Sequence, residues 1–207
     1  AIIKLDNMDI IIGNNVEGVD YRLSDNMHVS DGSLVLDIIN MQQLIWKEKL
    51  YRLDTGKEVN SISQTVVNAY YQPLSNSVVI PAAFFELIDE NSSYYEMLGT
   101  LGMILAHEIV HGFDSNGSQF DSDGNLNDWW SSDDELVFER LRNDVSKYYS
   151  KYEVLDGKYI DGDKTVNENM ADLGAIACIS DLAILNGASK DELRLMFSSF
   201  AKLWASC

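Results

Sequence analysis

The sequence predicts an α+β fold in which several helices pack with one small sheet. Two observations predict this class. In several long stretches apolar residues recur at helical spacing, and two short β-branched segments flank a turn. The 207 residues suffice for one domain with a substantial core. The formal net charge of −18 argues against nucleic acid as a partner, because phosphate binding needs clustered Lys and Arg.

The elements follow from local spacing and turn signals. Leu34–Arg52 is predicted to be helical, because its apolar residues recur one turn apart. Ser93 and Glu96 have the spacing of a capping box, and Gly112 is a suitable end for the helix that they begin. In chain order we expect a loop-rich start at 1–37, a helix at 34–52, a hairpin of strands 65–71 and 77–80 around a turn at 73–76, and helices at 92–112, 133–151, 167–185 and 190–204.

No apolar run reaches the length of a membrane span, so we expect no membrane segment in this chain. The first residues include Lys4, Asp6 and Asp9, unlike a secretory signal peptide. Cys178 lies in an apolar stretch and is expected to be a buried thiol.

His107-Glu108-Ile109-Val110-His111 is an H-E-x-x-H motif. Residues four apart share one face of a helix, so both imidazoles can reach one ion. Zinc binds imidazole nitrogen readily, and Glu108 is placed beside the metal as a general base for the attacking water. The alternative is a chance motif on a solvated helix. It is disfavoured because the surrounding residues are apolar and two of the chain's three histidines are in the motif.

A catalytic zinc needs a third protein ligand. Asp114 and Gly117 stand where a metzincin would have Gly and His, and His28 is interpreted as an ordinary surface residue, so a carboxylate must complete the set. Glu168 and Asp172 share a face of a predicted helix, so one can ligate the metal while the other orients a histidine. Taken alone, an exposed acidic helix start would explain these two residues better.

Three motifs together resemble the neprilysin and endothelin-converting-enzyme family of gluzincin metallopeptidases. The resemblance runs from about Ile12 to the end of the chain, and the long gap between His111 and Glu168 also separates this family from thermolysin-like and aminopeptidase-like enzymes. The motifs are Asn68-Ala69-Tyr70-Tyr71, similar to N-A-Y-Y; His107 to Asp114 with the later Gly124-Asn125-Leu126 and Trp129-Trp130, similar to H-E-x-x-H-x-F-D and G-N-L-x-D-W-W; and Glu168 to Asp172, similar to E-N-x-A-D.

The resemblance implies a mostly helical, thermolysin-like zincin domain whose small sheet carries a substrate edge strand. It implies one zinc ion per chain, with His107, His111 and Glu168 as ligands. Glu108 would be the general base. The second catalytic carboxylate, Asp172, would hold His107 in place.

Two further roles follow from the resemblance. Asp114 would hold His111, as Asp172 holds His107. Asn68 and Ala69 would bind the substrate backbone by strand addition, a mode that recognises main chain rather than sequence.

The expected function is zinc-dependent endoproteolysis of oligopeptides, on the amino side of apolar residues. One alternative is a zinc-binding but inactive remnant that serves as an interaction module. Another is a structural domain without metal. The intact Glu108 favours the enzyme.

The chain departs from the family pattern in three places. Residues 58–65 lack a Trp that the family usually has. The family's D-x-H segment and the Arg after it, expected beyond the Trp204 region, are not in this sequence. Most of the family's helical lid is also not in it. We therefore expect 1–207 to be a partial catalytic domain, with about 1–35 as the end of the lid. Such a chain would bind zinc, hydrolyse peptides poorly and tend to self-associate. Asp121–Asn125 superficially resembles a calcium loop, but Gly124 comes too early for an EF-hand and a turn is expected.

Overall fold

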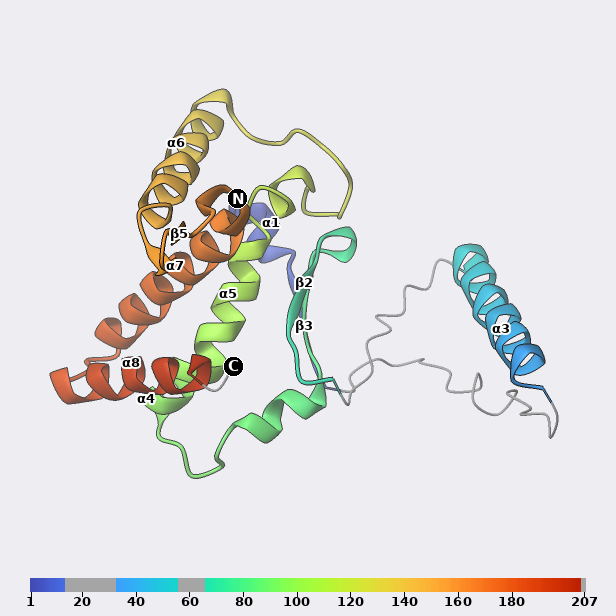
Figure 1. The fold of residues 1–207 in the computed structure, drawn as a ribbon, viewed down its shortest axis with the longest axis horizontal. Helices are drawn as coiled ribbons and strands as arrows, with labels where there is room; N and C mark the ends of the chain where they lie inside the picture. Colours follow the sequence, from blue (N-terminus) through green and yellow to red (C-terminus); the bar gives the residue numbers. More distant parts are fainter. Residues whose placement is uncertain (14–32, 56–65, 206–207) are drawn as a thin grey trace. The chain divides into compact units, whose positions relative to one another are not determined.

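The structure, a computed structural model, describes residues 1–13, 33–55 and 66–205 (Figure 1). The chain forms two compact units, one of residues 1–13 and 64–207 and one of residues 14–63. In the second unit the described element is helix α3 (Leu34–Thr55), which confirms the helix expected there. His28 lies outside the described residues.

A three-stranded sheet crosses the larger unit in the order β1-β3-β2. β2 (Tyr70–Gln72) and β3 (Ser77–Ile80) form the predicted antiparallel hairpin, whereas β1 (Asp9–Ile12) runs parallel to β3. The central strand β3 is buried along its whole length, and β2 lies at the edge of the sheet.

The first strand of the hairpin is shorter than predicted. Tyr70 pairs with Val79, so continuing the same register would place Asn68 opposite Pro81. Proline has no amide hydrogen to donate to a ladder, and residues 66–69 are accordingly not in a strand.

The prediction of a loop-rich start missed two short elements. Helix α1 (Ile2–Asp6) and strand β1 precede Gly13. β1 is stabilised by pairing with β3, so that Asp9 lies opposite Ser77. This partner is too distant in the sequence for a local pattern to reveal it.

The helix expected at 92–112 is confirmed, with an interruption. It consists of α4 (Tyr94–Met97), a π-helical turn (Leu98–Gly102) and α5 (Met103–His111). The predicted capping box is present, because Ser93 and Glu96 each accept a hydrogen bond from the other's backbone amide. Gly112 directly follows the last residue of α5.

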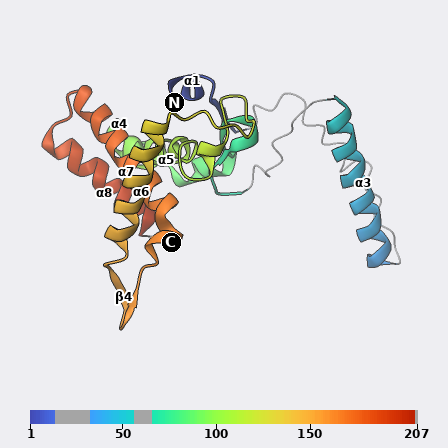
Figure 2. The ribbon, with the colours of Figure 1, turned by 90° about the horizontal axis from the view of Figure 1, so that it is seen from above.

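Three more helices complete the larger unit: α6 (Ser132–Tyr149), α7 (Gly162–Leu185) and α8 (Lys190–Trp204). α7 begins before the predicted residue 167, because the Asp161 side chain caps it by accepting from the Lys164 amide. A second, two-stranded sheet, β4 (Glu153–Leu155) with β5 (Lys158–Tyr159), was not expected; it projects beyond the end of α6 (Figure 2).

Helix α5 lies between the sheet and α7 (Figure 1). On one side Ile104 packs with Val78 and Ile80 of β3. On the other side Met103 and Ala106 pack with a cluster from α7 and α8. The members of that cluster are Ala175, Ile179, Ala183 and Met196.

These elements confirm the α+β class. Among the described residues no helix is long and apolar enough to span a bilayer. The prediction of a buried thiol is wrong: Cys178 is exposed, because the neighbouring positions Ala175 and Ile179 form the buried face of α7.

Candidate metal centre

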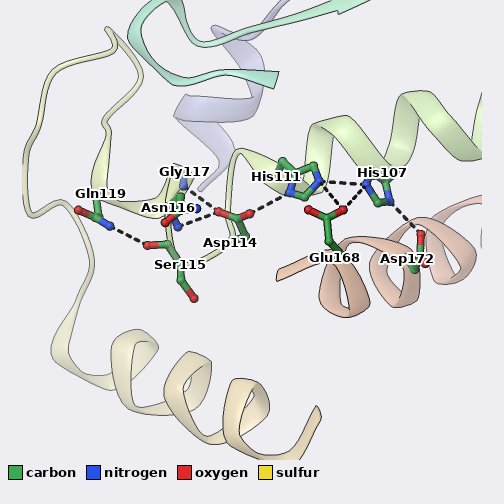
Figure 3. Close-up of polar contacts among 9 residues, drawn as sticks. All are labelled: His107, His111, Asp114, Ser115, Asn116, Gly117, Gln119, Glu168 and Asp172. Atoms are coloured by element: carbon green, nitrogen blue, oxygen red, sulfur yellow. Dashed lines mark hydrogen bonds and ion pairs between the residues drawn. The ribbon is translucent and has the colours of Figure 1, made fainter. Parts of the chain in front are cut away.

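His107 and His111 lie one turn apart on α5 and turn their side chains toward α7 (Figure 3). Their Nε2 atoms are 2.9 Å apart. The Oε2 atom of Glu168, on α7, lies 3.3 Å from Nε2 of His107 and 3.5 Å from Nε2 of His111. The structure therefore gathers these three predicted ligands around one point.

The spacing of these donor atoms fits a single zinc ion. Three atoms at zinc-ligand distances and tetrahedral angles would be about 3.3–3.6 Å from one another. The observed separations of 2.9, 3.3 and 3.5 Å lie close to this range.

The outer nitrogens of the two imidazoles both face carboxylates. Nδ1 of His107 lies 2.9 Å from Oδ1 of Asp172, and Nδ1 of His111 lies 2.8 Å from Oδ2 of Asp114. A carboxylate accepts a hydrogen bond, so each Nδ1 is assigned the proton, and the ring in its metal-binding form has its lone pair on Nε2. Two lone pairs and the Glu168 carboxylate then face one another, and a cation between them would satisfy all three.

A tight loop after α5 fixes Asp114. Its side chain is buried, and its Oδ1 accepts hydrogen bonds from the amides of Asn116 and Gly117, each at 2.8 Å. A Cβ at Gly117 would lie 2.0 Å from the carbonyl oxygen of His111, so the loop can close this tightly only with glycine. Gly117 was not predicted to belong to the site, although its place in the chain three residues after Asp114 is the signal that could have shown it.

Glu108 is buried beside the two histidines, with 8% of its surface exposed. Burial raises the pKa of its carboxyl group. The charges of His111 and His107 and a hydrogen bond from the Tyr71 backbone amide act in the opposite direction. That amide belongs to β2, so the edge strand runs beside the motif helix.

The two predicted substrate residues directly precede β2. Ala69 is buried in the core under the sheet, and Asn68 is exposed. The Asp121 segment forms the expected turn: Oδ1 of Asp121 accepts from the amides of Asp123 and Asn125, and Gly124 has φ +79°.

Comparison with known proteins gives the chain a family. Residues 68–206 match the family model described as peptidase family M13. The chain is 35% identical over 217 aligned residues to a neutral endopeptidase of Lactococcus lactis subsp. cremoris. This alignment covers 99% of this chain and 32% of that protein. It is 33% identical over 159 residues to human endothelin-converting enzyme 1, covering 70% of this chain and 20% of the enzyme.

Solved structures agree with this assignment. A crystal structure of PEPO from Lactobacillus rhamnosis HN001 superposes with a TM-score of 0.81 at 28% identity, covering 98% of this chain and 32% of that one. The structure of the Mycobacterium tuberculosis zinc metalloprotease Zmp1 with an inhibitor superposes with a TM-score of 0.81 at 26% identity. The superposition covers 98% of this chain and 33% of Zmp1. The chain thus spans between about a fifth and a third of the length of these relatives. It belongs to peptidase family M13, the zinc metallopeptidase family of neprilysin and endothelin-converting enzyme.

Proposed function

We propose that this chain is the metal-binding part of a zinc endopeptidase that hydrolyses oligopeptides. The observation that carries the proposal is the convergence of three donor atoms, from His107, His111 and Glu168, with the buried Glu108 beside them. Two similar proteins, named neutral endopeptidase and endothelin-converting enzyme 1, support a peptide as substrate.

Each carboxylate around the centre has its own proposed role. When bound, zinc supplies Lewis-acid polarisation of the scissile carbonyl and acidifies a water. Glu108 takes the proton from the attacking water and passes it to the leaving amine. Asp172 and Asp114 hold the two imidazoles with Nε2 turned inward, through the hydrogen bonds to Nδ1.

The edge of the sheet is the proposed substrate platform. β2 is an edge strand, and its Tyr71 amide reaches Glu108, so an extended peptide along this edge would pass close to the general base. Asn68 and Ala69, just before β2, would bind the peptide backbone. A preference for cleavage on the amino side of apolar residues follows from the family resemblance.

The second candidate is a zinc-binding module without activity. It shares the same three ligands but has no need of a buried carboxylate beside the metal. Keeping Glu108 ionisable in a buried position is unfavourable, which favours the enzyme over the inactive module.

Metal analysis and an activity assay test the proposal. The purified chain should carry one zinc ion, and His107→Ala should remove most of it. The protein that carries this chain should cleave a fluorogenic peptide, lose activity with a chelator and regain it with zinc. Absence of bound zinc would refute both candidates; bound zinc without hydrolysis would leave the interaction module.

We make two further proposals about the chain as a whole. One is that the chain is a partial catalytic domain. The other is self-association, which is supported by exposed apolar side chains at the end of α7, where Ile184 is 61% and Leu185 83% exposed. Size-exclusion chromatography across a concentration series tests self-association.

A further inference from the structure

Lys4 is a buried cation outside the metal centre. Only 2% of its surface is exposed, although it belongs to the short helix α1. Its Nζ donates hydrogen bonds to the carbonyl oxygens of Gly117 and Phe120, each at 2.6 Å. Three rings surround the ammonium, with their centroids 5.6 to 5.8 Å from Nζ: Tyr71, Phe113 and Trp129.

The first attachment of Lys4 leads to a predicted zinc ligand. Gly117 accepts from Lys4 through its carbonyl and donates through its amide to Oδ1 of Asp114. The other oxygen of Asp114 faces Nδ1 of His111. Lys4 therefore reaches the His111 ring through two intervening residues, all joined by hydrogen bonds of 2.6 to 2.8 Å.

The second attachment leads to the proposed general base. The Lys4 carbonyl accepts from Nδ2 of Asn76 at 2.9 Å, and Oδ1 of Asn76 accepts from the Tyr71 hydroxyl at 2.9 Å. The backbone amide of Tyr71 in turn donates to the Glu108 carboxylate. Lys4 thus contacts Gly117, which holds Asp114 beside the predicted zinc ligand His111, and Asn76, which binds the residue that donates to Glu108.

Several groups around Lys4 offset part of the cost of burying its charge. Two carbonyl oxygens and three ring faces stabilise a cation, and Asp121 and Asp114 supply negative charge nearby. Burial lowers the pKa of Lys4 to about 8, so most of the molecules still carry the charge at neutral pH. A side chain without N–H groups at position 4 would leave both carbonyls without this donor.

We propose that Lys4 is a positioning residue of the metal centre: its ammonium holds the 114–120 loop in the shape in which Asp114 orients His111 toward the metal. The inference rests on the proposed function, because it takes His111 as a zinc ligand. A purely structural role, in which Lys4 only fastens α1 to the rest of the unit, makes a different prediction. It would lower the stability of the metal-free and zinc-bound forms equally and leave the zinc affinity of the folded chain unchanged.

The test measures zinc affinity of the 207-residue chain at neutral pH by competition with a fluorescent zinc chelator. Lys4→Met keeps the apolar stem and removes the charge; we expect it to weaken zinc binding about tenfold, at the low end of the effect of residues that support metal ligands. Lys4→Arg, which keeps the charge and the donors, should retain most of the affinity. Lys190→Met removes one positive charge from an exposed position and should bind zinc like the parent.

A double-mutant cycle then tests the route. If Lys4 acts through Asp114, Lys4→Met in an Asp114→Ala background should change the affinity by less than about twofold. A full tenfold loss in that background would overturn the route, and a single Lys4→Met variant with parental affinity would overturn the positioning role.

The proposed function and this inference fail in different ways. A parent chain that binds no zinc refutes the function and the inference with it, whereas a parent that binds zinc beside an unaffected Lys4→Met variant refutes the inference alone. Circular dichroism establishes that each variant is folded. If neither Lys4→Met nor Lys4→Gln folds, Lys4 serves the fold itself and the positioning role is wrong.

Discussion

Gly174 of α7 lies against Val110 of α5 so closely that a Cβ at position 174 would come to 2.9 Å from Cγ2 of Val110. Ala171 and Ala175, on the same helix, are completely buried. Small residues at this crossing let the two helices approach each other, and the approach brings Glu168 and Asp172 to the histidines of α5.

Gly174→Leu should therefore separate α5 from α7. We expect a loss of about 1–3 kcal/mol in unfolding free energy, measured with urea, from overpacking at the crossing. Zinc affinity should fall as well, because the third ligand moves away from the other two. Val110→Ala removes the opposing methyl groups and should restore part of both quantities; an unchanged zinc affinity in Gly174→Leu would show that the crossing does not position the ligands.

Asp172→Ala should weaken zinc binding without abolishing it. The carboxylate fixes the ring of His107 through Nδ1, and support of this kind contributes about 10- to 100-fold in metal affinity. Chelator competition measures the effect. Asp181→Ala is the matched control, since Asp181 is an exposed acid on the same helix. Equal affinities for the two variants would make Asp172 an ordinary surface acid.

Glu108→Gln should keep zinc and lose turnover. The amide side chain has nearly the same shape but cannot take a proton, and general-base catalysis contributes about 10² to 10⁴ in rate. The measurement is kcat on a fluorogenic peptide beside zinc content, in the protein that carries this chain. A near-parental kcat would remove Glu108 from the mechanism.

Alkaline pH should act on stability through Lys4. Its pKa is about 8 in the folded chain, against an ordinary value of 10.5, because burial disfavours the charge. Between these two values the unfolded chain binds more protons, so the Lys4 contribution to unfolding free energy rises with pH. Below about pH 8 both states are protonated and the contribution is flat.

Comparison of the metal-free parent with Lys4→Met isolates this contribution. The difference in unfolding free energy should shift in favour of the parent as pH rises from 8 to 10.5. The charges of Asp121 and Asp114 act on Lys4, and the Tyr71 ring lies beside its ammonium. Burial raises the pKa of Tyr71 to about 12, above this range. A difference that stays constant across the range would contradict the prediction.

The sequence predicted best those elements whose signals are local. α8 begins and ends where its spacing predicted, because the Ser189–Glu192 capping box and the apolar positions that follow lie within the element itself. α1 and β1 were missed for the opposite reason. Their stabilising partners, Gly117 for Lys4 and Ser77 for Asp9, lie far along the chain.

The residues of the site likewise fall into those that local spacing predicted and those that it did not. Helical spacing alone placed His107 and His111 on one face. Helical spacing also singled out the pair Glu168 and Asp172, but in an acid-rich chain only the family resemblance selected Glu168 as the ligand. The role of Gly117 in the site was not predicted, because it comes from the close approach of its backbone to His111, which composition does not show.

The π-helical turn at Leu98–Gly102 sets the direction in which the side chains of His107 and His111 point. It separates α4, whose start is fixed by Ser93, from α5, which carries the motif. Each residue of a helix advances the direction of the side chains by about 100°. Removing one residue from this turn would change the phase of α5 and swing both imidazoles away from α7, although every ligand would remain in the chain. In this protein the aim of the metal centre depends on the count of residues before the motif as well as on the residues within it.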